Sequence, residues 1–265
     1  MRNPRPSRMR LLPAILAAAL SGLASQAYAA RCEKQSPAHA VALVELYTSE
    51  GCDSCPPADR WLSELVREAR NAESLVALSL HVDYWDRLGW KDRFASPRFT
   101  ERQRELARLS GRRGLVYTPG VFVNLQEFRG GHLVDALRTI NGHPAEADIR
   151  IELDSPARAQ LSVRADFRLK PGAPAKQPRA FVVLYEDGLS TKVRAGENRG
   201  VALHYDRVVR EWFGPIDVAG AATFARVLDL APDWKPSRLG VAAFVEDQAK
   251  REVLQAMALA NCAAR

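Results

Sequence analysis

The sequence predicts an α/β domain followed by an all-β, sandwich-like domain, and two patterns support this prediction. Residues 41–48 and 75–82 are short apolar runs with an amphipathic stretch between them, which is typical of two parallel strands joined by a helix. After Pro144, stretches of alternating apolar and polar residues follow one another, separated by turn-rich pieces. We expect the α/β domain over residues 38–145 and the β domain over residues 146–262.

The first 29 residues have the composition of a secretory signal peptide. Four arginines precede an apolar stretch over residues 11–23, and the small-x-small pattern Ala27-Tyr28-Ala29 follows, as at a cleavage site. The apolar stretch is short for a bilayer span, although an uncleaved anchor is the alternative, and no later stretch approaches that length. We therefore expect a periplasmic or secreted protein, in a compartment that permits disulfides.

The net charge of +7 overstates how basic the mature chain would be. Four of these charges are arginines of the leader, whose removal leaves +3. The sequence also lacks the basic patch with interleaved aromatic residues that nucleic-acid binding requires. We expect no nucleic-acid partner.

The elements of the first domain follow from local patterns. Residues 41–48 form a buried strand, and Pro56 and Pro57 start a helix, because proline is tolerated in a first helical turn. One face of this helix is apolar, with Trp61, Leu62, Leu65 and Val66. Further along, the patterns predict a strand over residues 75–82, a charged helix over 97–109, a strand over 121–123 and a short helix over 133–140.

The second domain is predicted from stretches in which apolar and polar residues alternate, as in strands with one buried face. They cover residues 149–154, 159–169, 179–187, 201–213, 223–230 and 239–247. The proline-rich stretch 170–179 is expected to be a flexible loop, and the domain boundary is expected near residues 142–148.

Cys52 and Cys55 form a Cys-x-x-Cys pair directly before the first helix. A structural zinc site needs four ligands, but there is no second such pair, and the five histidines never occur at close metal-ligand spacing. A purely structural disulfide over so short a loop gains little chain entropy. A cysteine at a helix start is favoured as a thiolate, so the pattern predicts a redox pair in which Cys52 attacks and Cys55 resolves.

The stretch from Glu45 to Pro56 resembles the active-site strand and loop of the thioredoxin and glutaredoxin superfamily. Thr118-Pro119, before an apolar strand, resembles that superfamily's cis-proline loop. This resemblance implies an α/β thioredoxin-like domain, a catalytic role for Pro119 and substrate pairing at the Thr118 backbone. Glu45 would be a buried acid that takes the proton of Cys55, unless it is a solvated charge on a strand face.

Four longer motifs resemble a family of exported bacterial proteins known as a domain of unknown function, number 1223. They cover residues 44–59, 81–103, 116–124 and 196–210. The family has no established substrate, so this resemblance bears on the fold more than on the function. The chain departs from thioredoxin at Gly51 and at Asp53-Ser54, and the Asp53 charge opposes thiolate formation, which favours a reducing or isomerising role.

His81-Val-Asp-Tyr-Trp-Asp86 ends the second predicted strand, at the sheet edge where ligands of parallel sheets bind. His81, Asp83 and Asp86 are candidates for a metal site, for pocket lining, or for helix caps that fix a loop. Tyr84 and Trp85 are expected to contact substrate together with Thr118. For the arginines between residues 98 and 113 we favour a solvated helix face. Residues 196–200 and His204 indicate a turn before a strand, with no derivable chemistry.

Cys32 and Cys262 lie near the two ends of the mature chain. Sequence alone permits three pairings of four cysteines. We expect Cys52–Cys55 and Cys32–Cys262, because chain ends often lie close together and fray unless they are tied down. Two free thiols, an intermolecular bridge, or a relay that passes electrons to Cys52–Cys55 are the alternatives.

These observations predict an exported thiol–disulfide oxidoreductase that acts on protein thiols or exchanges with a redox partner protein. It would need no metal and no cofactor. The alternative is a non-catalytic binding module, or a protein that handles copper or another soft metal through the same two cysteines, because thiolates select Cu(I).

Overall fold

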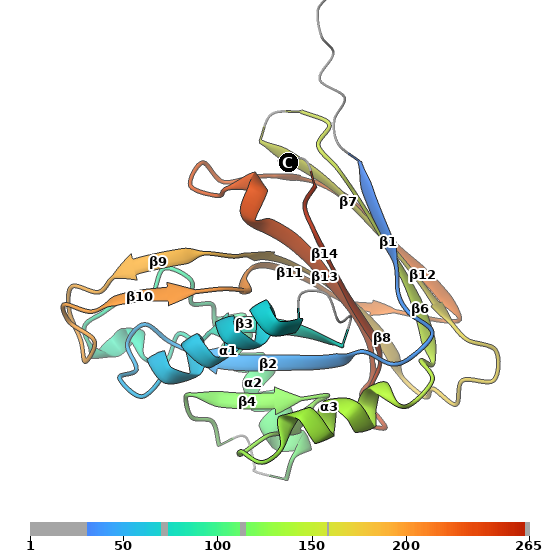
Figure 1. Ribbon diagram of the computed structural model, residues 1–265, viewed down its shortest axis with the longest axis horizontal. Coiled ribbons are helices and arrows are strands. Elements are labelled where there is room, and N and C mark those ends of the chain that lie inside the picture. Colours follow the sequence, from blue (N-terminus) through green and yellow to red (C-terminus); the bar gives the residue numbers. More distant parts are fainter. Residues whose placement is uncertain (1–30, 70–73, 112–114, 158, 263–265) are drawn as a thin grey trace, which may run out of the picture.

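The computed structural model describes residues 31–69, 74–111, 115–157 and 159–262, which are mostly β-strand (Figure 1). The predicted signal peptide, residues 1–29, lies outside the described residues. Among the described residues, no helix is long and apolar enough to cross a membrane.

The predicted elements of the first half are present in the structure. β2 (Ala42–Thr48) is buried along its whole length and runs parallel to β3 (Leu75–His81), and α1 (Pro56–Ala69) connects them. Leu62 of α1 packs in one apolar cluster with Val44 of β2. This helix covers one face of the two strands.

The opposite face is covered by α2 (Pro97–Leu109), which begins after its cap residue Ser96. β4 (Gly120–Val123) lies antiparallel beside β2, and β5 (Gln126–Glu127) pairs with β4. The chain then forms α3 (Leu133–Asn141). Two short 3₁₀ helices, η1 and η2, cover Asp86–Leu88 and Pro236–Arg238.

Strands of the second half extend the same sheet. β11 (Val208–Asp217) meets β3 in parallel at the pair Val208 and Ser79. Beyond β11 follow β8 (Pro178–Glu186), β13 (Leu239–Asp247) and β14 (Glu252–Ala260). The result is an eight-stranded sheet in the order β14-β13-β8-β11-β3-β2-β4-β5.

A second sheet packs against β8, β13 and β14. Its order is β1-β6-β7-β12, and its strands are β1 (Cys32–Gln35), β6 (Ala147–Asp154), β7 (Gln160–Leu169) and β12 (Ala221–Asp229). The strands of this sheet alternate between buried and less buried residues, as expected for a sheet with one covered face. An apolar cluster fills the space between the two sheets.

The remaining strands form a two-stranded hairpin. β9 (Leu189–Lys192) and β10 (Ala202–Tyr205) pair antiparallel and lie beside α1 (Figure 1). The connection between them, residues 193–201, therefore comes from the second half of the chain but lies next to the first helix.

The predicted fold class, an α/β thioredoxin-like domain followed by an all-β sandwich-like domain, is wrong. Strands of both halves belong to one sheet, and β1 pairs with β6 in the second sheet. The runs of β8 and β13 are apolar without alternation, because both faces of these strands are buried. The sequence pattern predicts strands with one exposed face in a separate domain, whereas they are interior strands of the sheet that contains β2 and β3.

The Cys32–Cys262 disulfide joins the start of β1 to the residues after β14, with the two Cα atoms 6.0 Å apart. It links residues separated by 230 positions in the sequence. The bond therefore ties the start of the described chain to its end.

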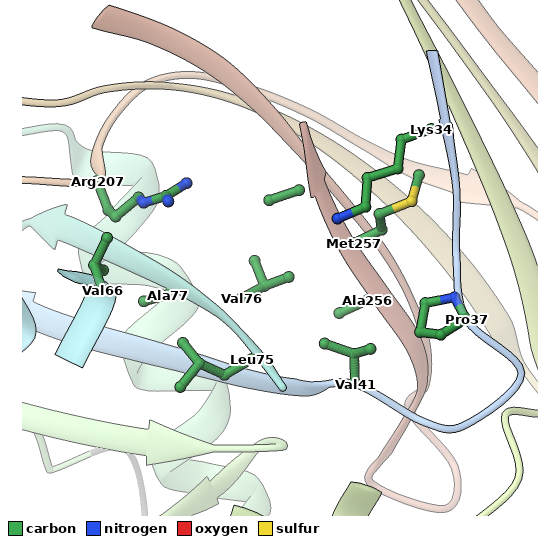
Figure 2. A pocket seen from close by; sticks show the side chains of 11 residues that line it. Lys34, Pro37, Val41, Val66, Leu75, Val76, Ala77, Arg207, Ala256 and Met257 are labelled. Carbon is green, nitrogen blue, oxygen red and sulfur yellow. The ribbon is translucent and has the colours of Figure 1, made fainter. Parts of the chain in front are cut away.

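A hollow lined mostly by apolar residues lies between β14 and the start of β3 (Figure 2). Val76 and Ala256 line it, and the cationic side chains of Lys34 and Arg207 lie at its sides. Cys52 and Cys55 lie at the opposite end of the parallel strands, after the last residue of β2. The hollow therefore lies apart from that pair.

Candidate functional site

The Cys52–Cys55 disulfide lies where β2 is followed by α1, with the two Cα atoms 5.4 Å apart. The turn before it is tight: the Gly51 amide donates to Ser49 Oγ at 3.1 Å, and the Cys52 amide donates to the Ser49 carbonyl at 3.2 Å. A Cβ atom on Gly51 would lie 3.2 Å from Cβ of Trp85, closer than side chains normally pack. Glycine therefore lets Trp85 pack directly on this turn.

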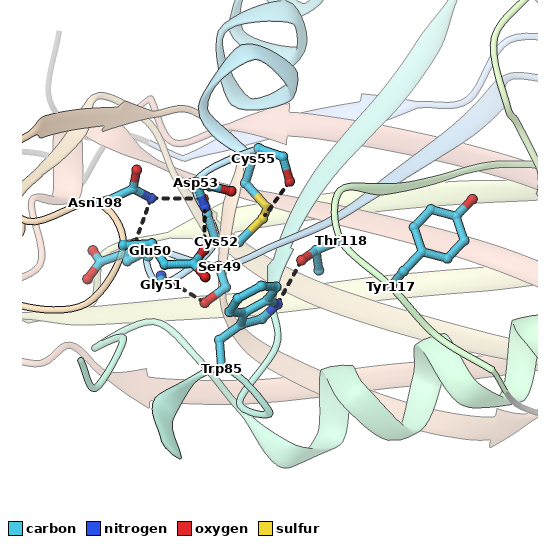
Figure 3. Close-up of a disulfide and its surroundings, with 12 residues drawn as sticks. Ser49, Glu50, Gly51, Cys52, Asp53, Cys55, Trp85, Tyr117, Thr118 and Asn198 are labelled. Atoms are coloured by element: carbon cyan, nitrogen blue, oxygen red, sulfur yellow. Dashed lines mark hydrogen bonds between the residues drawn. A yellow bond between two sulfur atoms is a disulfide. The ribbon is translucent and has the colours of Figure 1, made fainter. Parts of the chain in front are cut away.

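Both cysteines are 0% exposed, although Asp53 and Ser54 between them reach solvent. Asn198, from the β9–β10 connection, lies on one side of the loop, and Trp85 lies on another (Figure 3). The disulfide is therefore enclosed by residues from both halves of the chain.

Thr118, Pro119 and Trp85 were predicted to form part of the site. The Trp85 indole N–H donates to Thr118 Oγ1 at 2.8 Å, which joins the turn before Cys52 to the Thr118–Pro119 loop (Figure 3). The Thr118–Pro119 peptide bond is cis. Tyr84 donates to Gln103 Oε1 at 3.2 Å, its hydroxyl also interacts with the Thr118 side chain, and burial raises its pKa to about 12. Its hydroxyl is therefore held by α2.

Glu45 is buried with a raised pKa, as predicted, but it does not face the cysteines. It is fully buried on the face of β2 opposite α1, where it accepts hydrogen bonds from Tyr47 and from Arg102 at 3.2 Å each. Burial raises the pKa of Glu45, and the Arg102 guanidinium opposes this shift. Arg102 also binds Glu246 of β13, with a shortest contact of 2.7 Å. The structure thus places Glu45 in an ion-pair network between α2 and the sheet.

Asp59 is the buried acid that sequence reasoning missed. Its amide donates to the Cys55 carbonyl at 3.1 Å, so it lies one helical turn after Cys55, and it is only 4% exposed. Burial raises the pKa of Asp59 to about 7, although His81 and Thr48 oppose the shift. The spacing of Asp59, Leu62 and Val66 along the helix was the available signal, because it places Asp59 on the apolar face.

His81 and Asp92 form a buried pair behind Asp59. His81 Nδ1 lies 2.7 Å from Asp92 Oδ2, and this oxygen also accepts a hydrogen bond from the Glu50 amide at 2.8 Å. Burial lowers the pKa of His81, but the carboxylates of Asp92, Asp59 and Glu50 together make the net direction upward. Burial correspondingly raises the pKa of Asp92, but His81 reverses the shift and holds that pKa below its usual value. Each partner therefore favours the charged form of the other.

Several buried polar atoms near this pair make no hydrogen bond of standard geometry among the described residues. They are Thr48 Oγ1, Glu50 Oε1, both carboxyl oxygens of Asp59, His81 Nε2, Thr191 Oγ1 and Tyr205 OH. The His81 ring contacts the Tyr205 ring at 4.8 Å between centroids. The end of β2, the first turn of α1, the end of β3 and the β9–β10 hairpin thus bring buried polar groups together near the disulfide.

The three residues proposed for metal binding have separate partners. Asp83 accepts a hydrogen bond from the Thr100 hydroxyl at 2.5 Å, and Asp86 accepts one from the Asp92 amide at 3.1 Å. Both therefore fix the loop after β3, while His81 forms the buried pair with Asp92. In the described part of the chain, no three His, Cys, Asp or Glu residues are grouped so that they could hold a metal ion.

The fold and the site define a mostly β protein with an enclosed disulfide at a helix start, next to buried ionisable groups. The chain belongs to the family described as Protein of unknown function (DUF1223), whose model matches residues 43–246. The matched region contains Cys52, Cys55, Asp59, His81 and Asn198.

Two solved structures are similar to this chain. A protein from Agrobacterium tumefaciens is 26% identical, with a TM-score of 0.59, over 85% of this chain and 97% of that chain. HBP35 of Porphyromonas gingivalis has a TM-score of 0.61 over 84% of this chain and 76% of that chain, and its 15% identity makes this a likeness of fold alone. No protein with a curated description matches this chain.

Proposed function

We propose that the protein is a thiol–disulfide oxidoreductase that reduces or isomerises disulfides of other proteins through Cys52 and Cys55. The observation that carries the proposal is the position of Asp59, a buried carboxyl with a pKa of about 7, one helical turn from Cys55. An acid with this pKa exchanges protons near neutral pH, which the resolving cysteine of a redox pair requires. A disulfide with a purely structural role has no use for such a group.

In the proposed cycle, the Cys52 thiolate attacks one sulfur of a partner disulfide and displaces the other as a thiolate. Cys55 then passes its proton to the Asp59 carboxylate and attacks the Cys52 sulfur of the mixed disulfide. The second partner sulfur leaves as a thiolate, so the partner gains two electrons while the Cys52–Cys55 disulfide forms. A dithiol on a redox partner protein reduces that disulfide again and is itself oxidised.

The setting of Cys52 supports the reducing direction. A position at a helix start favours a thiolate through the helix dipole, but the exposed Asp53 carboxylate next to Cys52 opposes it. A thiolate of only moderate stability makes the reduced pair a better electron donor. The motif resemblance to the thioredoxin superfamily supports the same chemistry without reference to the overall fold.

We also propose that the protein works outside the cytoplasm. All four cysteines are paired in disulfides, which persist in oxidising compartments and are rare in the cytosol. The predicted leader over residues 1–29 supports the same location. The partners would then be exported proteins with disulfides, and the periplasm is the expected place in a bacterium.

A trapping experiment tests this function. In Cys55→Ala the mixed disulfide cannot be resolved, so exported partner proteins should remain attached to Cys52 and separate only on reduction. The double variant Cys52→Ser with Cys55→Ala is the matched control and should capture none. Equal capture by both variants, together with no exchange of the wild type with glutathione, contradicts the proposal. A reduced protein that binds Cu(I) but exchanges no disulfide would support the soft-metal alternative.

A further inference from the structure

The connection between β9 and β10 is a tight loop with a defined shape. The Arg199 amide donates to the Gly196 carbonyl at 3.2 Å, and the Gly200 amide donates to the Val193 carbonyl at 2.9 Å. Gly196 and Gly200 have φ values of +73° and +88°, which side chains other than glycine rarely adopt. These turns direct the Asn198 side chain toward the cysteine loop.

Asn198 is bonded to the backbone on both sides of Gly51. Its Nδ2 atom donates to the Cys52 carbonyl at 2.8 Å and to the Glu50 carbonyl at 3.0 Å (Figure 3). The side chain is buried, so if Asn198 moved away the Glu50 carbonyl would lose this donor, whereas the Cys52 carbonyl would keep the Cys55 amide, which donates to it at 3.3 Å. Beside it, Glu197 Oε2 accepts a hydrogen bond from the Asp53 amide at 3.2 Å. Three contacts thus hold the β9–β10 loop on the cysteine loop.

The same loop has a second attachment near Trp90. A Cβ atom on Gly196 would lie 3.3 Å from Cβ of Trp90, so the two backbones approach closely. The Trp90 indole N–H in turn donates to Glu50 Oε2 at 2.7 Å. Glu50 therefore contacts the β9–β10 loop through its carbonyl and Trp90 through its side chain. These contacts join the β9–β10 loop, the segment before the cysteines and the segment around Trp90.

Thiol–disulfide exchange requires a thiolate to approach a sulfur along the line of the S–S bond. Because both cysteines are 0% exposed, no thiol reaches the bond in this arrangement. Asn198 belongs to a surface loop of a two-stranded hairpin, whereas Trp85 is held between the cysteine loop and Thr118. The β9–β10 loop belongs to a hairpin that is not part of either larger sheet, so it can move without breaking the hydrogen bonds of those sheets.

We propose that Asn198 controls access to the Cys52–Cys55 disulfide, and that exchange takes place only after residues 196–200 move away from the cysteine loop. The inference rests on the proposed function, for which it supplies the residue that decides which thiols reach the bond. A partner that displaces Asn198 can replace its hydrogen bonds to the Glu50 and Cys52 carbonyls, and the backbone N–H groups of a polypeptide are suited to this.

The test is the rate at which dithiothreitol reduces the Cys52–Cys55 disulfide in the folded protein. One dithiothreitol thiolate attacks a sulfur of the bond and the other cysteine leaves as a thiolate; the second dithiothreitol thiol then closes its own ring and frees the first cysteine. Free thiols are alkylated at intervals and counted on each peptide by mass spectrometry. Reduction of Cys32–Cys262 in the same samples is the internal reference.

We test Asn198→Ala and the near-isosteric Asn198→Asp, which has no amide donor. In each variant, dithiothreitol should reduce the Cys52–Cys55 disulfide about tenfold faster than in the wild type, which corresponds to an activation barrier lower by about 1.4 kcal/mol. Arg199→Ala, at an exposed neighbour in the same loop, is the matched control and should keep the wild-type rate. If the Asn198 variants fail to fold, Glu197→Ala at an exposed position should give an increase of about twofold. Wild-type rates in the Asn198 and Glu197 variants, or equal acceleration by Arg199→Ala, would overturn the inference.

This assay separates the inference from the function on which it rests. Dithiothreitol needs no partner protein, so a tenfold acceleration by Asn198→Ala supports controlled access even if Cys55→Ala captures nothing. Capture of partners by Cys55→Ala together with unchanged reduction rates in Asn198→Ala supports the oxidoreductase and overturns the role of Asn198.

Discussion

The two disulfides of this protein are the same bond in two different surroundings. Cys32–Cys262 links strands at the ends of the chain, and Cys32 packs against the apolar cluster between the two sheets. Cys52–Cys55 spans three positions at a helix start, near Asp59 and His81. A long loop gives a cross-link its effect on stability, whereas nearby proton acceptors give a disulfide its reactivity. The comparison assigns a structural role to Cys32–Cys262 and a chemical role to Cys52–Cys55.

The largest expected effect is on stability and comes from the bond between the chain ends. Replacing Cys32 and Cys262 by serine should lower the free energy of unfolding by roughly 5 kcal/mol, because the closed loop exceeds two hundred residues. Replacing Cys52 and Cys55 by serine opens a loop of only a few residues and should cost about 2 kcal/mol. Denaturant unfolding without reductant measures both. Equal losses of the free energy of unfolding in the two double variants would show that the two disulfides do not differ in their contribution to stability.

The next effect concerns the reactivity of the second bond. Asp59→Asn removes the proton acceptor for Cys55, so the mixed disulfide should resolve about 100-fold more slowly at pH 7. Release of a model peptide from Cys52 in stopped-flow experiments measures this rate. Glu68→Gln, at an exposed position on the same helix, is the control and should leave the rate unchanged.

The same variant has an opposite effect on stability, which excludes simple damage to the fold. The pKa of Asp59 is higher in the folded than in the unfolded chain, so the folded state binds an extra proton between about pH 4 and pH 7. This contribution to stability is present at low pH and is lost as pH rises through about 7. Asp59→Asn should therefore be more stable than the wild type at pH 8, by on the order of 2 kcal/mol. A variant that is slower and also less stable at pH 8 would contradict the assigned role.

The smallest effect is a shift of the pH profile. The His81 imidazolium lowers the pKa of Asp59, so His81→Gln should raise the pH midpoint of the resolution rate by about one pH unit. Asp92, Glu50 and Tyr205 also face this group, and they stay in place in the variant. Arg60→Gln removes an exposed charge that water screens, and it should shift the midpoint far less. An unchanged pH midpoint of the resolution rate in His81→Gln would show that His81 does not influence the pKa of Asp59.

Local patterns predicted the elements of the fold but not their assembly. The periodicity around Leu62 and the buried run of residues 41–48 were sufficient to place α1 and β2. The sheet depends instead on the contact of Val208 with Ser79, two residues far apart in the sequence, and no local pattern specifies such a pairing. The apolar run of β8 indicates burial on both faces, as in an interior strand of a covered sheet. The prediction instead assigns this run to a strand of a separate sandwich.

The site was predictable to the extent that it depends on one segment. Cys52 and Cys55 follow from their spacing at a helix start, and helical periodicity would also have indicated Asp59. Asn198 could not be predicted in this way, because its position depends on where the β9–β10 hairpin packs against α1. Glu45 was assigned to the disulfide from its place in the motif, but the alternation of β2 turns it toward Arg102 on the opposite face.

The most direct test of the difference between the two bonds is a titration of the wild-type protein in glutathione redox buffers, with alkylation of each cysteine followed by mass spectrometry. We predict that Cys52 and Cys55 pass reversibly from disulfide to thiols as the ratio of reduced to oxidised glutathione rises, while Cys32–Cys262 stays oxidised and circular dichroism shows an unchanged fold. If Cys52–Cys55 opens only together with Cys32–Cys262, or only when the protein unfolds, both bonds are structural and the proposed chemistry is wrong.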